Sequence, residues 1–329
     1  MRVVLLPGDG IGPEVTREAR RALEQLAPDV ELEEHLVGGA AIRATGKPLG
    51  DEALAACRAA DAVFKGPVGD PEFDAADVRP EQALLALRKE LDVYTNLRPA
   101  RAGDVDLLVV RELVGGLYFG ARGVRDDGTV FDTCEYHPSQ VERIARRGFD
   151  LARTRRSRLT SVDKANVLET SRMWRRVVNE VAADYPDVEL DHMLVDNAAM
   201  QLVRAPERFD VILTENTFGD ILSDVAAEVT GGLGLAPSAS LGDSGPGLYE
   251  PVHGSAPDVA GLGIANPVAT LRTVALLLEH GLGRPDEARQ LDEAIEDALD
   301  GTRTPDLGGS ATTAQVGDAV LARFTAFTR

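Results

Sequence analysis

Short apolar runs alternate with amphipathic stretches along most of the chain. Residues 2–8 (RVVLLPG), 61–69 (DAVFKGPVG) and 106–113 (DLLVVREL) are apolar runs that end in glycine or polar residues, which is typical of buried strands. Residues 14–27 (EVTREARRALEQLA) and 80–91 (PEQALLALRKEL) place apolar residues at helical spacing. The alternation predicts an α/β fold in which helices cover a sheet.

One segment interrupts this alternation. Residues 112–137 (ELVGGLYFGARGVRDDGTVFDTCEYH) are rich in glycine, β-branched and aromatic residues, which favours a hairpin over a helix. We therefore predict a β-arm at about residues 113–136. Such arms often contribute to oligomer interfaces.

The opening loop resembles a dinucleotide-binding glycine motif. In LLPGDGIGPEV, Gly8 and Gly10 fit the pattern G-x-G-x-x-G, but Pro13 occupies the third glycine position. Proline is well suited to the first turn of a helix. The segment therefore predicts a strand-to-helix turn, and the evidence for a nucleotide site must come from elsewhere.

The composition narrows the class of protein. A length of 329 residues fits two lobes or one large α/β unit. The net charge of −19 argues against nucleic acid or an anionic membrane as a partner. With no apolar run of about 20 residues and no signal-peptide pattern, we expect a cytoplasmic protein. Cys57 and Cys134 lack metal-ligand spacing and are expected to be free thiols.

Carboxylates gather where a helix is expected to follow a buried strand. Asp220, Asp224 and Glu228 recur every fourth residue from a helix start placed at Asp220, and Asp196 ends another apolar run, MLVDNAAM. Carboxylates without His or Cys suit Mg²⁺ or Mn²⁺. A solvated helix face is the alternative. The apolar residues expected to face the core on this helix are Ile221, Leu222, Val225 and Val229.

Basic and phenolic side chains suggest binding of an anionic substrate. Arg88, Arg98 and Arg111 follow or lie within apolar stretches, and a guanidinium grips a carboxylate through two parallel hydrogen bonds. Surface ion pairs are the alternative for each arginine. Lys164 lies between an apolar strand and a helix, and it would form a proton-handling pair with Tyr118 if the fold brings them together.

Residues 249–267 (YEPVHGSAPDVAGLGIANP) are dense in turn-forming residues. The backbone amides of Gly254, Ser255 and Ala256 suit a diphosphate, and Asp258 suits the two hydroxyls of an adenosine ribose. A 2′-phosphate would meet the charge of Asp258, so the segment favours NAD⁺ over NADP⁺. An ordinary surface loop is the alternative.

Several ordered motifs together resemble the β-decarboxylating dehydrogenases of the isocitrate/isopropylmalate family. They are LPGDGIGPEV, LLALRKELDVYTNLRPA, VRELVGGLYFG, SVDKANVLETSRMWRRVVNEVA, DNAAMQLV, NTFGDILSDVAAEVTGGLGLAPSAS, EPVHGSAPDVAGLGIANP and TPDLGGSATT. The resemblance covers essentially the whole chain and is closest to the members that oxidise 3-isopropylmalate.

The resemblance implies a two-domain α/β fold, not a Rossmann fold, with a mixed sheet flanked by helices and a β-arm. Residues 1–94 and 232–329 would form the cofactor-binding domain, and residues 95–231 the substrate and dimerisation domain. It also implies a homodimer with shared active sites. Asp220 and Asp224 of one subunit would bind Mg²⁺ or Mn²⁺ with Asp196 of its partner, and Lys164 would also come from the partner.

The family also implies roles for further residues. Arg88, Arg98 and Arg111 would hold the substrate carboxylates, with Tyr118, Lys164 and Asp196 as the catalytic set. Leu84 and Leu85 would accept an isopropyl group, since a carboxylate there would lack a partner. The residues implied in NAD⁺ binding are Glu81, Glu250, His253, Gly254, Ser255, Ala256, Pro257, Asp258 and Asn266.

The implied reaction is the NAD-dependent oxidation and decarboxylation of 3-isopropylmalate to 2-oxoisocaproate (4-methyl-2-oxopentanoate), a step of leucine biosynthesis. Gln82, Ala83 and Val114 depart from common family residues and leave the 3-alkyl substituent open. Homoisocitrate, isocitrate and 3-methylmalate are the alternative substrates on this scaffold. An inactive regulatory subunit is an alternative of another class, although such a subunit should lack part of the Tyr, Lys and Asp set, all of which is present. A metal-free Rossmann-type dehydrogenase would need the missing glycine motif.

Overall fold

The computed structural model describes residues 1–327 and divides the chain into two compact units. Unit 1 contains Met1–Val93 and the residues from Leu233 onward, and unit 2 contains Tyr94–Gly232. Unit 1 is therefore built from two separate stretches of the chain, whereas unit 2 is continuous. The predicted roles of the two units in cofactor and substrate binding stay predictions.

The strands of unit 1 follow the order β2-β1-β3-β12-β11. All neighbours in this order are parallel except β11 and β12, which are antiparallel. The strands are β1 (Arg2–Leu6), β2 (Glu31–Glu34), β3 (Ala62–Lys65), β11 (Ala239–Leu241) and β12 (Gly247–Tyr249). The α-helices are α1 (Gly12–Leu26), α2 (Gly39–Thr45), α3 (Asp51–Ala59), α4 (Gln82–Glu90), α9 (Val268–Leu276), α10 (Pro285–Leu299) and α11 (Thr313–Phe327).

The strands of unit 2 follow the order β4-β5-β10-β8-β9. Only β4 and β5 are antiparallel. The strands are β4 (Thr95–Ala102), β5 (Val105–Glu112), β8 (Arg158–Asp163), β9 (Glu189–Leu194) and β10 (Val211–Thr214). The helices are α5 (Pro138–Arg153), α6 (Glu169–Ala182), α7 (Val195–Arg204) and α8 (Asn216–Val229).

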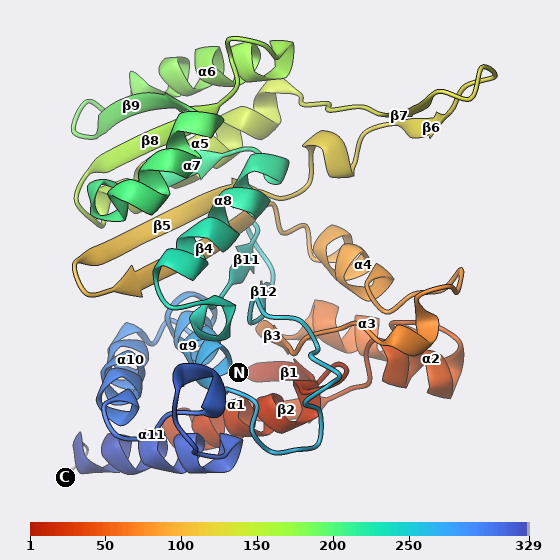
Figure 1. Cartoon of the computed structure of the whole chain (residues 1–329), viewed down its shortest axis with the longest axis vertical. Coiled ribbons are helices and arrows are strands. Elements are labelled where there is room, and N and C mark those ends of the chain that lie inside the picture. Colours follow the sequence, from red (N-terminus) through yellow and green to blue (C-terminus); the bar gives the residue numbers. More distant parts are fainter. Residues whose placement is uncertain (328–329) are drawn as a thin grey trace. The chain divides into compact units, whose positions relative to one another are not determined.

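Two helix pairs cover the sheet of unit 2. Helix α5 packs against α6, and α7 packs against α8 (Figure 1). The connections through α5 and α6 lead from β5 to β8 and on to the edge strand β9, whereas the connection through α7 leads back from β9 to β10. Since such crossovers are right-handed, the pair α5–α6 and the pair α7–α8 lie on opposite faces of the sheet. The α/β prediction with a mixed sheet and flanking helices is thereby confirmed.

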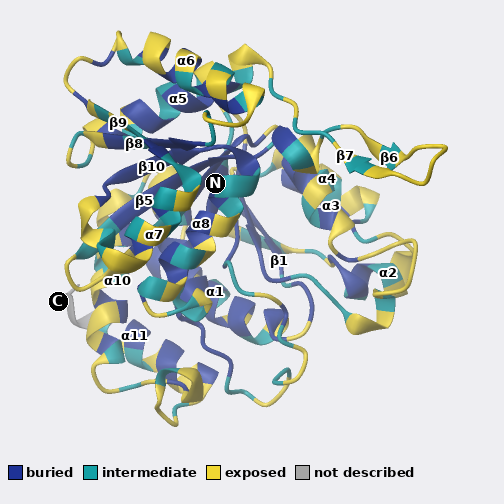
Figure 2. Ribbon diagram, turned by 45° about the horizontal axis from the view of Figure 1, so that its top comes forward, coloured by how far each residue is buried: buried dark blue, intermediate teal, exposed yellow. Residues whose placement is uncertain are grey.

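One apolar cluster of unit 2 lies between the sheet and the pair α7–α8. Figure 2 shows the strands β5, β8 and β10 largely buried. The fully buried residues of this cluster include Leu107, Val109, Val162, Ile212 and Leu222.

The β-arm is a short hairpin within unit 2. Strands β6 (Arg122–Val124) and β7 (Val130–Asp132) pair antiparallel, and Figure 1 shows them extending away from the sheet of that unit. Val124 and Val130 are both exposed in the described chain. The hairpin prediction for this segment is confirmed.

Three details of the predicted helices and strands were wrong. Helix α8 begins at Asn216, so Asp220 lies in its second turn and not at its start. The run that contains Asp196 divides into β9, which ends at Leu194, and α7, so Asp196 lies in the first turn of a helix. Ile221 is 58% exposed, because Leu222 and Ala226 form the face of α8 that packs into the core.

The opening loop forms the predicted strand-to-helix turn, with Pro13 in the first turn of α1. Gly10 has a φ of 56°, and a Cβ atom there would lie 2.0 Å from the carbonyl oxygen of Ser255. Ile11 N donates to that same oxygen at 2.8 Å. The opening loop and the loop around Ser255 are therefore in direct backbone contact within unit 1.

Two further predictions concern the whole chain. Cys57 and Cys134 are free thiols, as predicted. Within residues 1–327, no helix has the length and apolar character needed to cross a membrane.

Candidate active site

Asp220 and Asp224 lie on successive turns of helix α8, followed one turn later by Glu228. Asp220 and Asp224 are partly exposed, at 38% and 54% of their side-chain surface. Burial raises the pKa of Asp224; the charge of Arg98 opposes this rise, and the charge of Asp220 adds to it. The two carboxylates repel each other and offer only oxygen atoms as ligands. A hard cation bound between them would relieve this repulsion.

Two of the predicted substrate arginines lie beside these carboxylates. Arg111 is buried near the end of β5, which has β4 on one side and β10 on the other. Its Nη1 donates to Asp220 Oδ1. Arg98 Nη1 lies 3.8 Å from Asp224 Oδ1. Asp220 and Asp224 therefore each face a guanidinium from the antiparallel pair β4–β5.

Tyr118 completes this group. It ends the short 3₁₀ turn η2 (Gly116–Tyr118), and its hydroxyl donates to Asp220 Oδ2 at 3.0 Å. Burial raises the pKa of Tyr118, and the charge of Asp220 raises it further. The phenol is therefore protonated at neutral pH and can serve as a proton donor.

Lys164 and Asp196 form a second group in unit 2. Lys164 directly follows β8, and its Nζ donates to Asp196 Oδ1 at 2.8 Å. This hydrogen bond lowers the pKa of Asp196. Across residues 1–327, no three His, Cys, Asp or Glu side chains come close enough to hold a metal ion. Within one chain, Asp196 therefore does not join Asp220 and Asp224.

The third predicted substrate arginine lies in unit 1. Arg88 is buried on α4, and its Nη2 lies 3.3 Å from Glu250 Oε1. The other oxygen of Glu250 lies 2.8 Å from the Nζ of Lys65, which is also buried. Glu250, predicted as a cofactor residue, contacts both of these cations, and its role toward the cofactor stays a prediction. Lys65 was not among the predicted site residues, because it lies at the end of a short apolar run that indicates only a buried strand.

Three further predicted residues lie on or directly before α4. Leu84 is half-buried and Leu85 is 50% exposed on α4, one turn before Arg88. Glu81 is exposed at the N-cap position of this helix.

The predicted cofactor loop has a defined backbone. Ala256 has a φ of 39°, which is uncommon for a residue with a side chain. Its side chain packs on the apolar cluster that includes Ile11 and Val15. Gly254, Pro257 and Asp258 are exposed, whereas Ser255 is buried.

Two other residues of this loop region are held by neighbours. His253 Nδ1 lies 3.0 Å from Gly254 O, and burial lowers the pKa of the imidazole, so the ring is neutral at pH 7. Asn266 Nδ2 donates to Asp306 Oδ2 at 2.9 Å. Asp306 was not among the predicted site residues, although it lies in the quoted motif TPDLGG.

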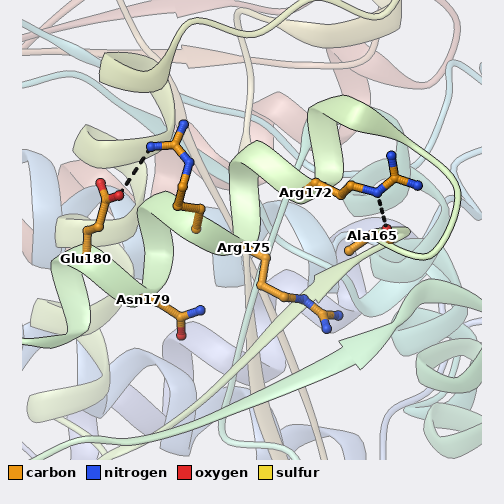
Figure 3. Close-up of a pocket in the computed structure, with 6 residues that line it drawn as sticks. Ala165, Arg172, Arg175, Asn179 and Glu180 are labelled. Carbon is orange, nitrogen blue, oxygen red and sulfur yellow. Dashed lines mark hydrogen bonds and ion pairs between the residues drawn. The ribbon is translucent and has the colours of Figure 1, made fainter.

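A hollow of about 520 Å³ over α6 lies apart from these groups. Figure 3 shows arginines of α6 around it. Arg175 is paired with Asp163, Arg176 with Glu180 and Arg172 with Glu169. Because none of the predicted site residues lines this hollow and its cations are paired with acidic side chains, we do not assign it to the active site.

Residues 2–320 match the family described as isocitrate/isopropylmalate dehydrogenase. A 3-isopropylmalate dehydrogenase from Zymomonas mobilis is 54% identical, over 98% of this chain and 99% of that protein. Another, from Novosphingobium aromaticivorans, is 53% identical over 98% of this chain and 100% of that protein.

Solved structures of similar proteins agree. An isocitrate dehydrogenase from Methylococcus capsulatus has a TM-score of 0.90 and 39% identity, over 98% of this chain and 99% of that one. A β-decarboxylating dehydrogenase from Thermococcus kodakarensis has a TM-score of 0.88 and 39% identity, over 99% and 97% of the two chains.

Proposed function

The chain belongs to the isocitrate/isopropylmalate dehydrogenase family, and we propose that it oxidises and decarboxylates 3-isopropylmalate with NAD⁺. The products would be 4-methyl-2-oxopentanoate and CO₂, in a step of leucine biosynthesis. Relatives named 3-isopropylmalate dehydrogenase share about half of their residues with it over nearly the whole length. The observation that carries the proposal is the group of Arg98, Arg111, Tyr118, Asp220 and Asp224 at one end of β4, β5 and α8.

This group fits a dicarboxylate substrate and a divalent metal. Arg98 and Arg111 offer guanidinium groups to the substrate carboxylates. Asp220 and Asp224 present only oxygen atoms, which suits Mg²⁺ or Mn²⁺. When bound, such a cation supplies positive charge beside the substrate oxygen at which negative charge develops.

Protein side chains would move the two protons of the reaction. Lys164 would help to remove the proton of the 2-hydroxyl group as hydride passes to NAD⁺. After loss of CO₂, Tyr118 Oη would deliver a proton to the substrate carbon. The raised pKa of Tyr118 supports this role, because the hydroxyl keeps its proton until it is needed.

The cofactor would bind at the loop of residues 253–258 in unit 1. The exposed Gly254 and Asp258 are accessible to a ligand. The contact between the opening loop and Ser255 holds the loop backbone in place. Asp258 would accept hydrogen bonds from the ribose hydroxyls and favour NAD⁺ over NADP⁺.

We also propose a homodimer with shared active sites. Helices α7 and α8 pack together and expose Met200, Val203 and Ile221, each more than half accessible. A contiguous exposed apolar patch is typical of an interaction surface. Pairing of two copies through these helices would let Lys164 and Asp196 of one subunit complete the site of the other.

An assay of NADH formation tests the function. We expect the highest kcat/KM for 3-isopropylmalate among 3-isopropylmalate, 3-methylmalate, isocitrate and homoisocitrate, and no turnover after thorough chelation. Asp224→Asn should lower kcat by at least about 100-fold, because a developing charge loses its stabilisation. A higher kcat/KM for isocitrate would assign the chain to the isocitrate-oxidising members of the family. Undiminished turnover in the presence of a chelator would reject the metal site.

A further inference from the structure

Two buried asparagines contact Arg98 and Arg111 in unit 2. Asn96 and Asn216 are 0% and 1% exposed. Asn96 Oδ1 accepts a hydrogen bond from Arg98 Nε at 2.9 Å. Asn216 Oδ1 accepts from both Nε and Nη2 of Arg111, at 3.0 and 2.8 Å. Each arginine therefore donates its Nε–H to a neutral amide oxygen.

The strand register explains why these side chains meet. Asn96 in β4 lies directly opposite Arg111 in β5, and Arg98 follows two residues after Asn96. Directly opposite residues of an antiparallel pair share a face, as do alternate residues of one strand. Asn96, Arg98 and Arg111 therefore project from one face of β4–β5, and α8 brings Asn216 to Arg111.

The Asn216 amide has one favourable orientation. Its Nδ2 donates to Gly115 O at 3.0 Å, while its Oδ1 faces Arg111. A flipped amide would place NH₂ against the guanidinium and oxygen against the carbonyl, and both contacts would be repulsive. Gly115 directly precedes the turn that carries Tyr118. The same amide thus links Arg111 to the backbone next to Tyr118.

An amide is chemically distinct from a carboxylate at these positions. Both fix a guanidinium through hydrogen bonds, but a carboxylate also cancels its charge. Arg111 and Arg98 already face Asp220 and Asp224. A further carboxylate would weaken the attraction for a doubly charged substrate.

We infer that Asn96 and Asn216 are positioning residues that orient Arg98 and Arg111 toward the substrate carboxylates while preserving their positive charge. This inference rests on the proposed function, because it assigns the dicarboxylate to these arginines. If the asparagines were only buried polar groups of the core, their loss would lower stability and leave substrate affinity unchanged.

The test compares Asn96→Ala, Asn216→Ala and Asn216→Asp with the wild type. Calorimetry would give the Kd of 3-isopropylmalate with Mg²⁺ present and NAD⁺ absent, and separately the Kd of NAD⁺. We expect the Kd of 3-isopropylmalate to rise at least about tenfold in each variant, or about 1.4 kcal/mol, because the guanidinium loses the hydrogen bond that orients it. We expect the Kd of NAD⁺ to change less than about twofold. Asn216→Asp keeps the shape of the side chain and an acceptor for Arg111, but it adds a negative charge and loses the donation to Gly115 O. It therefore tests the inference even if Asn216→Ala fails to fold.

Ser161→Ala is the matched control. Ser161 is fully buried in the same unit, and its Oγ accepts a hydrogen bond from Trp174 Nε1 at 3.2 Å. Its loss should lower the melting temperature without changing either Kd. If the asparagine variants behave like this control, the inference is wrong.

A double variant separates the inference from the proposed function. Arg111→Lys alone should weaken 3-isopropylmalate binding, and adding Asn216→Ala should then have less than about a twofold further effect. Additive effects would show that Asn216 does not act through Arg111 and would overturn the inference alone. An unchanged Kd in Arg111→Lys would overturn the proposed role of Arg111 itself, and the inference with it.

Discussion

Glu112 is a carboxyl group enclosed within unit 2 at the end of β5. Burial raises its pKa to about 7, although Val114 N, Gly115 N and Arg143 all favour the charged form. This pKa lies above the ordinary value of 4.5, so the folded state binds more protons than the unfolded state between these two values. The stability contribution of Glu112 is therefore fully present below about pH 4.5 and falls as pH rises through about 7.

Glu112→Gln should remove this pH dependence. The difference in urea midpoint, variant minus wild type, should become more positive from pH 5 to pH 8, because only the wild type must ionise a buried group. Glu142→Gln on the exposed face of α5 is the control and should show no such trend. A constant difference for Glu112→Gln would mean that the carboxyl group is already ionised at pH 5.

Asp258 is the residue expected to set cofactor choice. We predict that the wild type prefers NAD⁺ over NADP⁺ by at least about tenfold in kcat/KM, or roughly 1.4 kcal/mol. Asp258→Ala should reduce that preference, because a 2′-phosphate would no longer meet a carboxylate. Asp297→Ala, an exposed site on α10, should leave it unchanged. Equal kcat/KM for both cofactors in the wild type would contradict the assignment.

At the scale of elements, Tyr136 connects the end of the arm to the start of α8. Its hydroxyl donates to Glu215 Oε2 at 3.1 Å and accepts from Asn216 N at 3.0 Å. Glu215 in turn caps the helix by accepting from Phe218 N at 2.7 Å. One hydroxyl therefore fixes both the capping residue and the first residue of the helix that carries Asp220 and Asp224.

Tyr136→Phe should destabilise unit 2 by about 1–3 kcal/mol, the usual cost of leaving a buried donor unsatisfied. The free energy of unfolding in urea measures this loss. The remaining ring still packs edge-on against Trp174, at a centroid distance of 6.0 Å, so the change isolates the hydroxyl. A loss below about 0.5 kcal/mol would indicate that water replaces it.

The sequence predicted the elements better than their ends. The apolar runs indicated β1, β3 and β5, and the helical spacing indicated α1 and α4. The start of α8 was missed because its cap is Glu215, whereas Ser, Thr, Asp and Asn are the usual caps. Ile221 was assigned to the core because helical spacing identifies an apolar position without showing how far that position turns toward the sheet.

The site residues named from the sequence came mainly from motifs. Asn96 and Asn216 were missed for a physical reason: an asparagine is common at the surface, and only the pairing of β4 with β5 brings Asn96 opposite Arg111. Lys65 and Asp306 were missed likewise, since Glu250 and Asn266, their partners, are remote in the chain. Such partners depend on long-range pairing, which local patterns do not encode.

At the scale of the whole molecule, the candidate residues of unit 2 form two groups. Tyr118 belongs to the group around Asp220, and Lys164 is paired with Asp196. In the proposed homodimer, the first group of one subunit would work with the second group of its partner. A dissociated subunit would then be inactive.

Mixing two inactive homodimers, Tyr118→Phe and Lys164→Ala, should restore activity after subunit exchange. In a mixed dimer, one site receives both defects and the other receives both intact residues. Random exchange makes about half of the dimers mixed, so the rate should approach about a quarter of wild type if the sites act independently. Mass measurement verifies the mixed dimers. No recovery despite their presence would place both residues in the site of one subunit.

The division of unit 1 between two stretches of the chain has a consequence for synthesis on the ribosome. Strand β3 has β1 on one side and β12 on the other, but roughly 180 residues separate Lys65 from Gly247. At a synthesis rate of about 5–20 residues per second, the edge of β3 that pairs with β12 stays unpaired for roughly 10–40 s. All of unit 2 emerges during this interval and can fold first. The nascent N-terminal stretch must meanwhile keep an apolar strand edge from pairing with other chains, so chaperone demand should be greatest before residue 247 is made.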